Sequence, residues 1–457
     1  MEIDIMNETS STLKIIEVSN KRWIYWGEYN LVFQYSQPLM NVLRSYETGI
    51  SEKEILQIQD DGIKEELRKV FENVEMVRNK RDDLNIYLNS IEKENWDKDK
   101  YLLGVLFEVS NDCNLRCTYC YGQGGNYGAS RCLMNSKTLK KSLEYCFKRF
   151  TPNEKISIVF FGGEPLINSK IIFEAVEAIN AFASKNGNTV RYSVTTNGTI
   201  LNTELLNLFQ KNDFIVTVSI DGGELIQNRN RPFATGKGSY DVISKNVEVM
   251  LKNRIRLIAR ITLTGPNIKN LSTAVEDIWN IGFNDVTFEL VSTDSEELSV
   301  STRDIDDFKK QINILSDITF NNIVSNKRGR LKKLTDYVFD IRNVKLGQTC
   351  SYNSHRGIVI SSNGDFYRCH RLLEQKQFCV GNTSESINWE RFICKCSYDK
   401  YCSGCWGKNI CARCAQENYE YTGDLEKPDL LRCEFKKIVM EAGIKLFIRL
   451  WIHDNSN

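Results

Sequence analysis

The sequence predicts an α/β protein in which a parallel sheet with crossover helices forms the central domain. Six apolar runs of strand length alternate with six helical patterns between residues 101 and 326, and this alternation is typical of βα units. Short polar or glycine-containing motifs follow most of these strands, as expected where strand ends build a reactive site. Strand signals before this region and a cysteine-rich segment after it predict two flanking domains, for which 457 residues are enough.

Hydrophobic periodicity defines the elements of the central region. Apolar runs predict strands at 102–109, 156–161, 190–196, 214–220, 255–263 and 286–291. Apolar residues at helical spacing predict helices near 136–149, 169–184, 202–211, 240–253, 268–281 and 303–324. Because the strands of a parallel sheet run in one direction, the motifs that follow them are expected to meet at one end of the sheet.

Composition and charge exclude several functional classes. Sixty lysine and arginine residues against 59 acidic residues give a formal net charge of +1, so no global field directs the chain to nucleic acid or to an anionic membrane. Residues 1–11 contain no apolar stretch of signal-peptide length, and Lys445 and Arg449 interrupt the apolar C-terminal stretch. We expect a soluble, cytoplasmic protein that binds neither nucleic acid nor membranes.

The first hundred residues begin with strands and continue with helices. Three β-branched or aromatic runs predict an antiparallel meander: 13–18, 22–26 and 29–35. Pro38 opens a helical pattern, and Ser51 with Glu54 forms a capping box before a second helix. A third helical pattern covers 63–77.

These elements predict a winged-helix-like domain over residues 1–80. A DNA-binding winged helix needs a basic surface to neutralise phosphates, and this segment is not basic enough. An exposed edge strand can instead capture an extended peptide by strand addition. The order of elements resembles the leader-peptide recognition domain of enzymes that modify ribosomally made peptides. Residues 81–100 are strongly charged, and we expect them to form a partly helical linker.

Three cysteines follow the first predicted strand of the central region. Cys113, Cys117 and Cys120 are separated by three and then two residues. Three thiolates can hold three corners of a cubane iron–sulfur cluster, and the iron without a protein ligand is then open to a small molecule. A zinc site that lacks its fourth ligand is the alternative interpretation of this motif.

Further motifs lie at the ends of the next four predicted strands. In chain order these are Gly162-Gly163-Glu164-Pro165, Thr195-Thr196-Asn197-Gly198, Ser219-Ile220-Asp221-Gly222, and Arg260 with Thr262. The Asn197-Gly198 and Asp221-Gly222 pairs are also compatible with plain turns. The predicted site therefore combines a cysteine motif with a glycine-rich acidic motif at neighbouring strand ends.

Together these motifs resemble the radical S-adenosylmethionine (SAM) superfamily, and the resemblance covers the whole of residues 101–326. It implies a partial (β/α)6 barrel and a 4Fe-4S cluster on Cys113, Cys117 and Cys120. It also implies that SAM chelates the open iron and yields a 5′-deoxyadenosyl radical, which takes a hydrogen atom from an unactivated carbon of the substrate. The cofactor supplies the difficult chemistry, and the protein supplies positioning and exclusion of water.

The resemblance also implies which side chains contact SAM. Gly162 and Gly163 leave room for backbone groups to approach the methionine amino group, and Glu164 would add negative charge beside it.

Two further polar residues, Ser219 and Asn197, would offer hydrogen bonds to the ribose or the carboxylate of SAM. Arg260 would pair with the methionine carboxylate. Tyr119, between two cluster ligands, matches the aromatic position that lies near adenine in the family.

Seven cysteines near the C-terminus have metal-ligand spacing: Cys350, Cys369, Cys402, Cys405, Cys411, Cys414 and Cys433. Their order is similar to the SPASM extension of radical SAM enzymes, here residues 350–433, which implies two auxiliary 4Fe-4S clusters and thus three in all. The resemblance assigns Cys402, Cys405, Cys411 and Cys433 to an outer cluster, and Cys350, Cys369 and Cys414 to an inner one. Two residues separate Cys411 from Cys414 where the family usually has three, which puts the geometry of the last ligand in doubt.

The inner cluster is one ligand short. Either Cys379, Cys394 or Cys396 reaches back to it, or one iron stays open and could bind a substrate thiolate. Paired CxxC spacing over 402–414 is also a zinc-ribbon signature, which remains the alternative.

The remaining segments have simpler interpretations. Residues 327–349 bridge the barrel to the cysteine-rich region, and 434–457 predict a core-packing C-terminal helix rather than a membrane anchor. Cys132 and Cys146 are expected to be ordinary buried or partly buried thiols.

These parts together resemble peptide maturases that join a cysteine sulfur to a carbon atom of a ribosomally made precursor peptide through a thioether. The expected partners are that precursor, whose leader would bind residues 1–80, and an electron donor such as flavodoxin or ferredoxin. An anaerobic sulfatase-maturing enzyme that makes formylglycine, and a radical SAM enzyme that cross-links carbon to carbon, share the same architecture. A zinc-stabilised winged-helix regulator is the non-enzymatic alternative.

Overall fold

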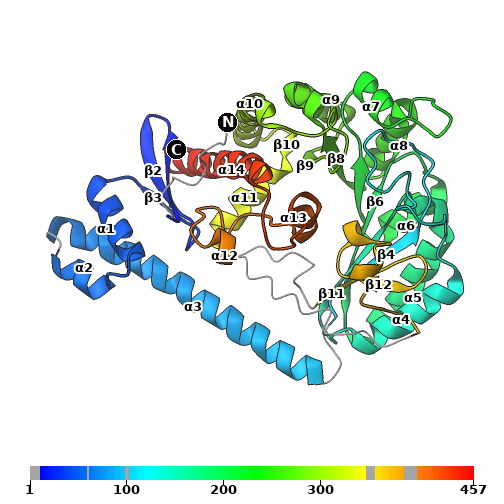
Figure 1. The fold of residues 1–457 in the computed structure, drawn as a ribbon, viewed down its shortest axis with the longest axis horizontal. Coiled ribbons are helices and arrows are strands. Elements are labelled where there is room, and N and C mark those ends of the chain that lie inside the picture. Colours follow the sequence, from blue (N-terminus) through cyan, green and yellow to red (C-terminus); the bar gives the residue numbers. More distant parts are fainter. Residues whose placement is uncertain (1–10, 59–60, 98–101, 346–355, 385–398, 457) are drawn as a thin grey trace.

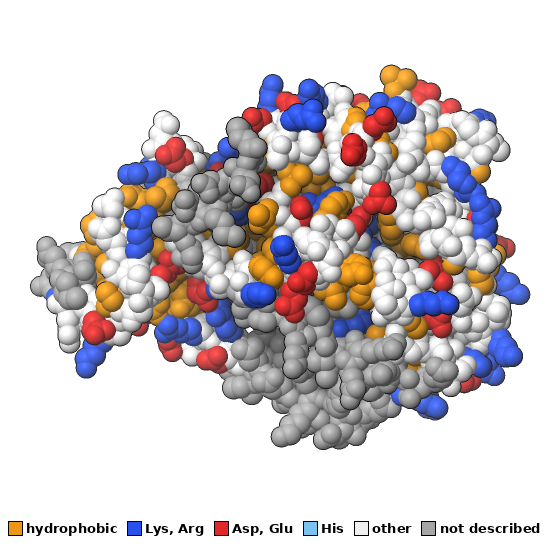
Figure 2. Space-filling model, viewed as in Figure 1, with side chains coloured by type: hydrophobic (Ala, Val, Ile, Leu, Met, Phe, Trp, Pro, Cys, Tyr) orange, Lys and Arg blue, Asp and Glu red, His pale blue; other side chains and the backbone are white. Residues whose placement is uncertain are grey.

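The computed structural model describes residues 11–58, 61–97, 102–345, 356–384 and 399–456. An N-terminal domain of strands and helices lies at one end of the molecule, and a large α/β sheet lies at the other (Figure 1). Helices of the C-terminal region fill the space between them (Figure 1). On the face shown in Figure 2, acidic and basic side chains are interspersed, in keeping with the near-zero net charge.

The N-terminal domain is a three-stranded antiparallel meander followed by three helices, as predicted. Its elements are β1 (Leu13–Val18), β2 (Lys21–Trp26), β3 (Leu31–Gln34), α1 (Gln37–Glu47), α2 (Glu52–Ile58) and α3 (Asp61–Asp97). Ser36 caps α1 by accepting a hydrogen bond from the Leu39 amide at 3.2 Å. The expected capping box is present, because Ser51 and Glu54 exchange backbone-to-side-chain hydrogen bonds. The domain has its own core, in which Trp26 and Phe71 are fully buried.

Helix α3 is longer than the sequence pattern predicts. The helical pattern covers 63–77, yet the helix continues to Asp97 without a break and includes most of the segment expected to be a linker. The charged residues of 81–97 are mostly good helix formers, so they can extend a helix whose first half is anchored in the core. The N-terminal domain is thus joined to the sheet by a continuous helix over most of this segment.

The central sheet has the predicted parallel order. The strands β4 (Gly104–Ser110), β5 (Lys155–Gly162), β6 (Thr189–Thr196), β7 (Ile215–Ser219), β8 (Arg256–Leu263), β9 (Asp285–Leu290) and β10 (Arg330–Leu331) pair in chain order. Each pair is parallel, with Val105 opposite Ile158 and Val218 opposite Ala259 in the registers of two of them. The six predicted strands are therefore confirmed to within two residues at each end.

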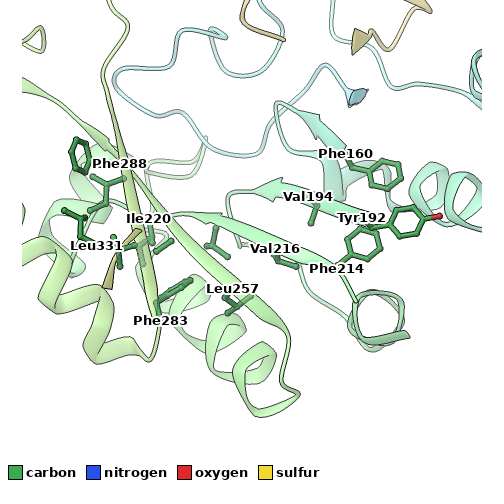
Figure 3. Packing of buried hydrophobic residues seen from close by; sticks show 14 of the residues in the cluster. Phe160, Tyr192, Val194, Phe214, Val216, Ile220, Leu257, Phe283, Phe288 and Leu331 are labelled. Carbon is green, nitrogen blue, oxygen red and sulfur yellow. The ribbon is translucent and has the colours of Figure 1, made fainter. Parts of the chain in front are cut away.

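Helices connect these strands on one face: α4 (Ser136–Arg149), α5 (Ser169–Asn186), α6 (Thr203–Lys211), α7 (Glu224–Asn230), α8 (Tyr240–Lys252), α9 (Leu271–Ile281) and α10 (Ile305–Val324). The short helix α7 was not expected from the sequence. Figure 3 shows the packing beneath the sheet, where Phe214 stacks on Phe160 and on Tyr192 with ring centroids 6.2 and 5.2 Å apart. This aromatic layer fixes the strands whose carboxyl ends carry the motifs.

The C-terminal region extends the same sheet. After α11 (Lys332–Arg342), strand β11 (Gly357–Ile360) pairs in parallel with β4, and β12 (Asp365–Tyr367) and β13 (Gly381–Asn382) follow as antiparallel neighbours. The Ser362 amide donates a hydrogen bond to the buried Glu108 carboxylate on β4 at 3.0 Å. The segment that carries Cys369 is thus attached directly to the strand that leads into the first cysteine motif.

The last helices close the fold. These are α12 (Asp399–Cys402), α13 (Ala415–Thr422) and α14 (Leu430–Ser456). Helix α14 packs on α10, α11 and β1, and Gly443 lets it approach α11, because a Cβ there would lie 2.6 Å from the Tyr337 Cβ. The helix begins at Leu430 rather than at residue 434, so Cys433 lies in its first turn. Among the described helices, none has the length and apolar character of a membrane span.

The N-terminal domain docks on the C-terminal region through the turn between β2 and β3. The Asn409 side chain donates hydrogen bonds to the carbonyl oxygens of Gly27 and Glu28, both at 2.7 Å. Tyr25 meets Trp406 edge-to-face with ring centroids 6.1 Å apart. This contact places the predicted peptide-recognition domain directly on the loop that carries Cys405 and Cys411.

Candidate active site

A cavity of about 170 Å³ opens at the carboxyl ends of the central strands. Its wall contains all three cysteines of the first motif, as well as residues from the ends of β5, β6, β7, β8 and β9. Two residues of the C-terminal region, His370 and Arg371, complete the wall. The structure thus brings together motifs that are up to 258 positions apart in the chain, from Cys113 to Arg371.

The three cysteines sit in a loop whose backbone donates to sulfur. The Cys113 Sγ accepts from the Leu115 amide at 3.4 Å, and the Cys120 Sγ accepts from the Gly124 amide at 3.3 Å. Burial raises the pKa of Cys113 to about 12 and that of Cys117 to about 11. Buried thiols of this kind stay protonated unless a metal replaces their protons, and amide donors to sulfur suit a thiolate ligand. The loop therefore fits an iron–sulfur cluster held by three cysteines.

The glycine-rich strand end packs against this loop. A Cβ on Gly163 would lie 2.5 Å from the Asp112 carbonyl oxygen and 2.7 Å from the Gly125 Cα. Gly162 has φ +145°, a conformation that side chains disfavour, and a Cβ there would lie 2.2 Å from the Ser110 carbonyl oxygen. Both glycines line the cavity. They are needed for the close approach of β5 to the cysteine loop as well as for access of a ligand to the backbone.

The Glu164 side chain does not line the cavity. Its carboxylate is outside the cavity wall and accepts hydrogen bonds from the Leu166 amide, the Thr196 hydroxyl and the Asn197 amide, at 3.0, 2.7 and 2.6 Å. Burial raises the pKa of this carboxyl to about 7. Glu164 thus links the ends of β5 and β6, and its charge contributes to the raised pKa of the nearby Cys113 thiol.

The other predicted SAM contacts lie at the cavity. Asn197, Ser219 and Arg260 line it together with Tyr119. The amide nitrogen of Asn197 donates to the Asn114 side chain at 2.8 Å and approaches the Cys113 Sγ at 3.7 Å. Asn197 therefore steadies the cysteine loop, while Ser219 and Arg260 stand on neighbouring strands in register with each other.

Asp221 is more than part of a turn. It is buried, and its carboxylate accepts hydrogen bonds from the Tyr119 hydroxyl, from the Asn230 side chain at 3.1 Å and from the Thr262 amide at 3.0 Å. It also forms an ion pair with Arg231, whose Nε lies 3.1 Å from Oδ1.

Arg231 itself was not singled out in the sequence. It lines the cavity, its Nη1 lies 3.9 Å from the Cys117 Sγ, and its guanidinium lies 5.3 Å from the centroid of the Tyr119 ring. An arginine nine positions after the Ser-Ile-Asp-Gly motif is the only signal in the sequence that could have indicated it.

Four cysteines of the C-terminal region surround a second, smaller cavity. Cys402, Cys405, Cys411 and Cys433, the predicted outer set, all line it, and Lys436 faces it as well. Burial raises the pKa of Cys411 to about 11 and that of Cys433 to about 12. Four cysteine side chains around one cavity fit the ligand set of a metal cluster. In the described part of the chain, no three histidine, cysteine or carboxylate side chains converge as ligands of a single metal ion.

The predicted inner set is only partly within the described residues. Cys350, Cys394 and Cys396 lie outside them. Cys369 packs beside Ala415, the residue that follows Cys414, so these two cysteines are on neighbouring segments. Cys379 belongs to a different cluster, and its thiol lies 3.3 Å from the Gly381 carbonyl oxygen.

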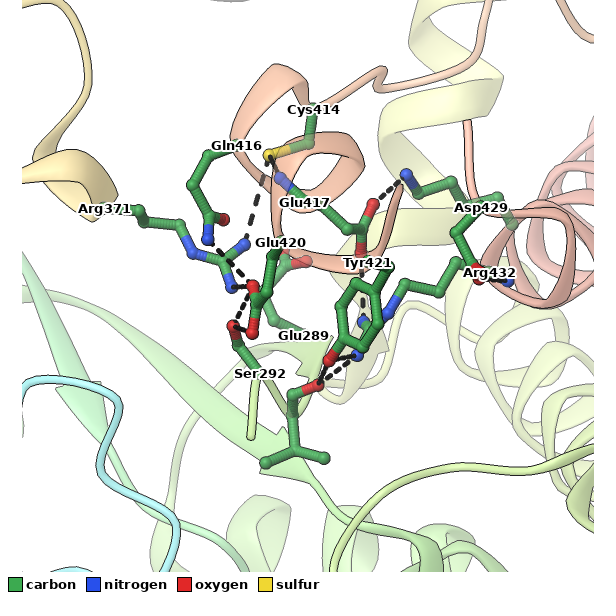
Figure 4. A network of polar contacts seen from close by, with 12 residues as sticks. Glu289, Ser292, Arg371, Cys414, Gln416, Glu417, Glu420, Tyr421, Asp429 and Arg432 are labelled. Atoms are coloured by element: carbon green, nitrogen blue, oxygen red, sulfur yellow. Dashed lines mark hydrogen bonds and ion pairs between the residues drawn. The ribbon is translucent and has the colours of Figure 1, made fainter. Parts of the chain in front are cut away.

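Arg371 connects Cys414 to the active-site cavity. Figure 4 shows its guanidinium between the Cys414 sulfur, at 4.0 Å, and the Glu420 carboxylate, at 3.8 Å. Glu420 in turn accepts from the hydroxyl of Ser292, another residue of the cavity wall. No sequence motif predicts a role for Arg371, whose one distinguishing feature is its place two residues after Cys369.

A buried carboxylate, Glu417, and two cations adjoin this network. Arg432 donates to Glu417 at 3.0 Å, and Lys436 contacts the same carboxylate (Figure 4). Burial alone would raise the pKa of Glu417, but these two cations lower it to about 2. The Glu417 amide donates to the Cys414 Sγ at 3.4 Å.

The two remaining cysteines are as expected. Cys146 is fully buried in α4 and Cys132 is partly buried, so both are ordinary thiols of the fold.

Comparison with known proteins identifies the central domain. Residues 107–278 match the Radical SAM superfamily. The cysteine-type anaerobic sulfatase-maturating enzyme of Clostridium novyi (strain NT) is 27% identical over 375 residues, which are 76% of this chain and 96% of that enzyme. Native anSMEcpe with bound AdoMet and Kp18Cys peptide has a TM-score of 0.62 at 18% identity, over 78% of this chain and 99% of that chain.

A second solved structure matches more of this chain. Streptococcus suis SuiB bound to S-adenosylmethionine has a TM-score of 0.51 at 13% identity, over 91% of this chain and 97% of SuiB. At these identities the two solved structures show a shared fold. The matched superfamily and the sulfatase-maturating relative indicate that the chain is an enzyme. Residues 107–278 are a radical SAM domain, with SAM and a 4Fe-4S cluster as the cofactors that this superfamily implies.

Proposed function

We propose that this chain is a radical SAM maturase that joins a cysteine sulfur to a carbon atom of a ribosomally made precursor peptide through a thioether. The observation that carries this proposal is the active-site cavity, in which the first cysteine motif faces Arg371 of the C-terminal cysteine region. The docking of the N-terminal domain on that same region adds to it. The matched Clostridium novyi relative, a sulfatase-maturating enzyme, acts on a protein substrate according to its name.

SAM and its cluster supply a 5′-deoxyadenosyl radical when bound, and this chain's residues position them. Cys113, Cys117 and Cys120 hold the cluster in the loop that β5 supports. Arg260 would pair with the methionine carboxylate, and Tyr119, whose hydroxyl is fixed on Asp221, would present its ring to the adenine. The walls of the cavity would hold the substrate carbon beside the radical and limit side reactions.

In the proposed reaction, one hydrogen atom leaves the acceptor carbon and becomes part of 5′-deoxyadenosine, and one proton leaves the peptide thiol. The thiolate and the carbon radical then share a new carbon–sulfur bond with one electron in excess. The C-terminal cysteines would hold an auxiliary cluster that could accept that electron, and a carrier such as flavodoxin or ferredoxin would supply the electron needed to cleave the next SAM.

Two auxiliary 4Fe-4S clusters are part of this proposal. The outer one would use Cys402, Cys405, Cys411 and Cys433, which surround one cavity. The inner one would use Cys350, Cys369 and Cys414. The Cys379 thiol packs in a separate cluster of side chains, which disfavours it as the fourth ligand. That position would be taken by Cys394 or Cys396, or it would be an open iron that binds the substrate thiolate beside Arg371. Three clusters predict about twelve irons per chain.

The N-terminal domain, residues 1–80, would hold the leader of the precursor. It is an antiparallel meander with a core of its own, the kind of unit that can add a peptide strand at its edge. The greater coverage of this chain by SuiB, 91% against 78% for anSMEcpe, supports a fold that extends beyond the parts shared with the sulfatase-maturating enzymes.

Anaerobic incubation of the reconstituted full chain with SAM, a reductant and a cysteine-containing precursor tests the proposal. We expect a product that has lost two hydrogens and in which one thiol no longer reacts with an alkylating agent. A precursor without its leader should react far more slowly, since the N-terminal domain would no longer hold it. A product whose thiols all remain alkylatable would refute thioether formation and favour a carbon–carbon cross-link.

Formylglycine formation, the reaction expected of an anaerobic sulfatase-maturing enzyme, is the second candidate, because the Clostridium novyi relative is named a cysteine-type anaerobic sulfatase-maturating enzyme. This reaction converts a cysteine into an aldehyde and releases its sulfur. Reaction of the product with a hydrazide probe therefore distinguishes it from a thioether, which retains the sulfur and has no aldehyde. A sulfatase-type enzyme should also act on short peptides with and without a leader alike.

A further inference from the structure

Arg231 lies buried between the first cysteine motif and the adenine-facing tyrosine. Only 7% of the residue is exposed, and the Asp221 carboxylate lies 3.1 Å from its Nε. A buried ion pair is not in itself evidence of a large gain in stability, because an apolar pair of similar size often serves as well. The remaining contacts of the guanidinium therefore indicate the role of its positive charge.

These contacts all point toward the cluster loop and the cavity. Nη1 lies 3.9 Å from the Cys117 Sγ, and Nη2 donates to the Thr262 hydroxyl at 3.2 Å. The Cζ atom of the guanidinium lies 5.3 Å from the centroid of the Tyr119 ring. One side chain thus approaches the cluster ligand Cys117, a cavity-lining residue of β8 and the aromatic residue between Cys117 and Cys120.

Asp221 fixes this side chain. Its charge opposes that of the guanidinium at the Cys117 sulfur, but Arg231 has the larger effect on the pKa of that thiol. The Asp221 carboxylate accepts hydrogen bonds from the Tyr119 hydroxyl, the Asn230 side-chain amide and the Thr262 backbone amide, and it forms an ion pair with Arg231. A carboxylate with three donors and an ion-pair partner is well compensated, and its position is determined by three separate segments of chain. The guanidinium is therefore held in one place beside the Cys117 sulfur.

We propose that Arg231 is a positioning residue that tunes the SAM-binding cluster, by holding a fixed positive charge against the Cys117 thiolate and by orienting Tyr119. The potentials of iron–sulfur clusters depend on net charge and on hydrogen bonds to their sulfurs. A cation beside a ligand sulfur favours the reduced cluster, since reduction adds a negative charge. The inference deepens the proposed function and rests only on its SAM-binding cluster, not on the peptide substrate.

The test compares Arg231→Gln with the wild-type chain after anaerobic reconstitution. A redox titration followed by electron paramagnetic resonance gives the midpoint potential of the cluster whose signal changes when SAM is added. We expect the equilibrium constant for reduction to fall at least tenfold, which is about 59 mV more negative for one electron. The affinity for SAM should fall as well, because Tyr119 loses the guanidinium that orients its ring.

Two further variants make the test independent of folding. Asp221→Asn combined with Arg231→Gln leaves no unpaired buried charge. Its shift should be negative but smaller than that of the single variant, because the carboxylate charge that opposes Arg231 at Cys117 is removed as well. Arg229→Gln is the matched control two positions earlier, because Arg229 is exposed and donates to the Asn267 and Asn230 side chains rather than to a cluster ligand. Its potential should equal that of the wild type.

The outcomes distinguish a failure of the proposed role of Arg231 from a failure of the proposed function. If wild-type and variant chains carry equal iron and the SAM-responsive cluster has the same potential in all of them, the role of Arg231 is refuted. If the wild-type chain shows no SAM-responsive cluster at all, the proposed function itself fails. An Arg231→Lys variant should retain most of the potential, since the charge remains, but should bind SAM more weakly, since a compact ammonium does not span Tyr119 and Thr262.

Discussion

Replacement of Gly27 by alanine should separate the N-terminal domain from the C-terminal region. A Cβ at this position would lie 1.7 Å from the Trp406 carbonyl oxygen, whereas real Cβ atoms essentially never come closer than 3.0 Å to another heavy atom. The two backbones must therefore move apart by about 1.3 Å, the difference between these distances. Backbone meets backbone here, so no flexible side chain can relieve the clash.

The expected cost follows from the contacts that this movement breaks. The two hydrogen bonds from Asn409, at 2.7 Å each, would lengthen beyond hydrogen-bond distance, at about 1 kcal/mol apiece. The edge-to-face contact between Tyr25 and Trp406 contributes about 1 kcal/mol more. A loss of about 3 kcal/mol corresponds to roughly a hundredfold increase in the open population of the interface.

Hydrogen exchange measured by mass spectrometry on residues 12–30 and 403–411 checks this prediction. If the interface opens and closes faster than the exposed amides exchange, exchange in both segments should accelerate about a hundredfold, since about 3 kcal/mol of interface energy is lost. Gly104→Ala is the matched control, because a Cβ on Gly104 meets its nearest atom at an ordinary 3.7 Å. Exchange rates in Gly27→Ala that match those of the control would show that the contact does not hold the two parts together.

Two more predictions concern β4 and β5. Burial raises the pKa of Glu108 to about 7, so the folded chain binds this proton more tightly than the unfolded chain does, and the free energy of unfolding falls as the pH rises from about 4.5 to 7. In urea unfolding, the free energy of unfolding of Glu108→Gln should therefore rise by up to about 3 kcal/mol relative to that of the wild type between pH 5 and pH 8. A difference between the two proteins that is equal at both pH values would contradict this. Gly163→Ala should displace the cysteine loop, because its Cβ would lie 2.5 Å from the Asp112 carbonyl oxygen, and iron analysis should show about four irons fewer per chain than in Gly104→Ala. Full iron content with an unchanged response to SAM would count against that close approach.

Much of the fold could be predicted because local hydrophobic patterns determine it. The helix at Ser136–Arg149 ends where its pattern ends, and all six strands of the barrel region coincide with apolar runs. The secondary structure of the charged segment 81–97 was harder to predict, since good helix formers without an apolar stripe are compatible with both a linker and a long helix. Pro266 lies in a 3₁₀ turn over Gly265–Asn270, and the α-helix expected from residue 268 therefore begins at Leu271.

The site could be predicted only in part, because its polar contacts join residues distant in the chain. The cysteine motif and the glycines were recognisable from spacing alone. The turn of Glu164 toward Thr196 was not, since it depends on how β5 and β6 align. The role of Asp221 depends on Tyr119, which is 102 positions away, and no local pattern connects the two.

The pairing of β11 with β4 limits how this enzyme can be re-engineered. The first cysteine loop follows β4, and Cys369 follows the β11–β12 hairpin, so a ladder from Gly357–Gly104 to Ile360–Phe107 fixes the spacing between the two cysteine regions. A C-terminal region from another protein can be grafted in working geometry only if the exchange includes a strand that fits this edge. The junction of such a chimera belongs before residue 357, and a shift of one residue in the graft would turn its inward side chains outward.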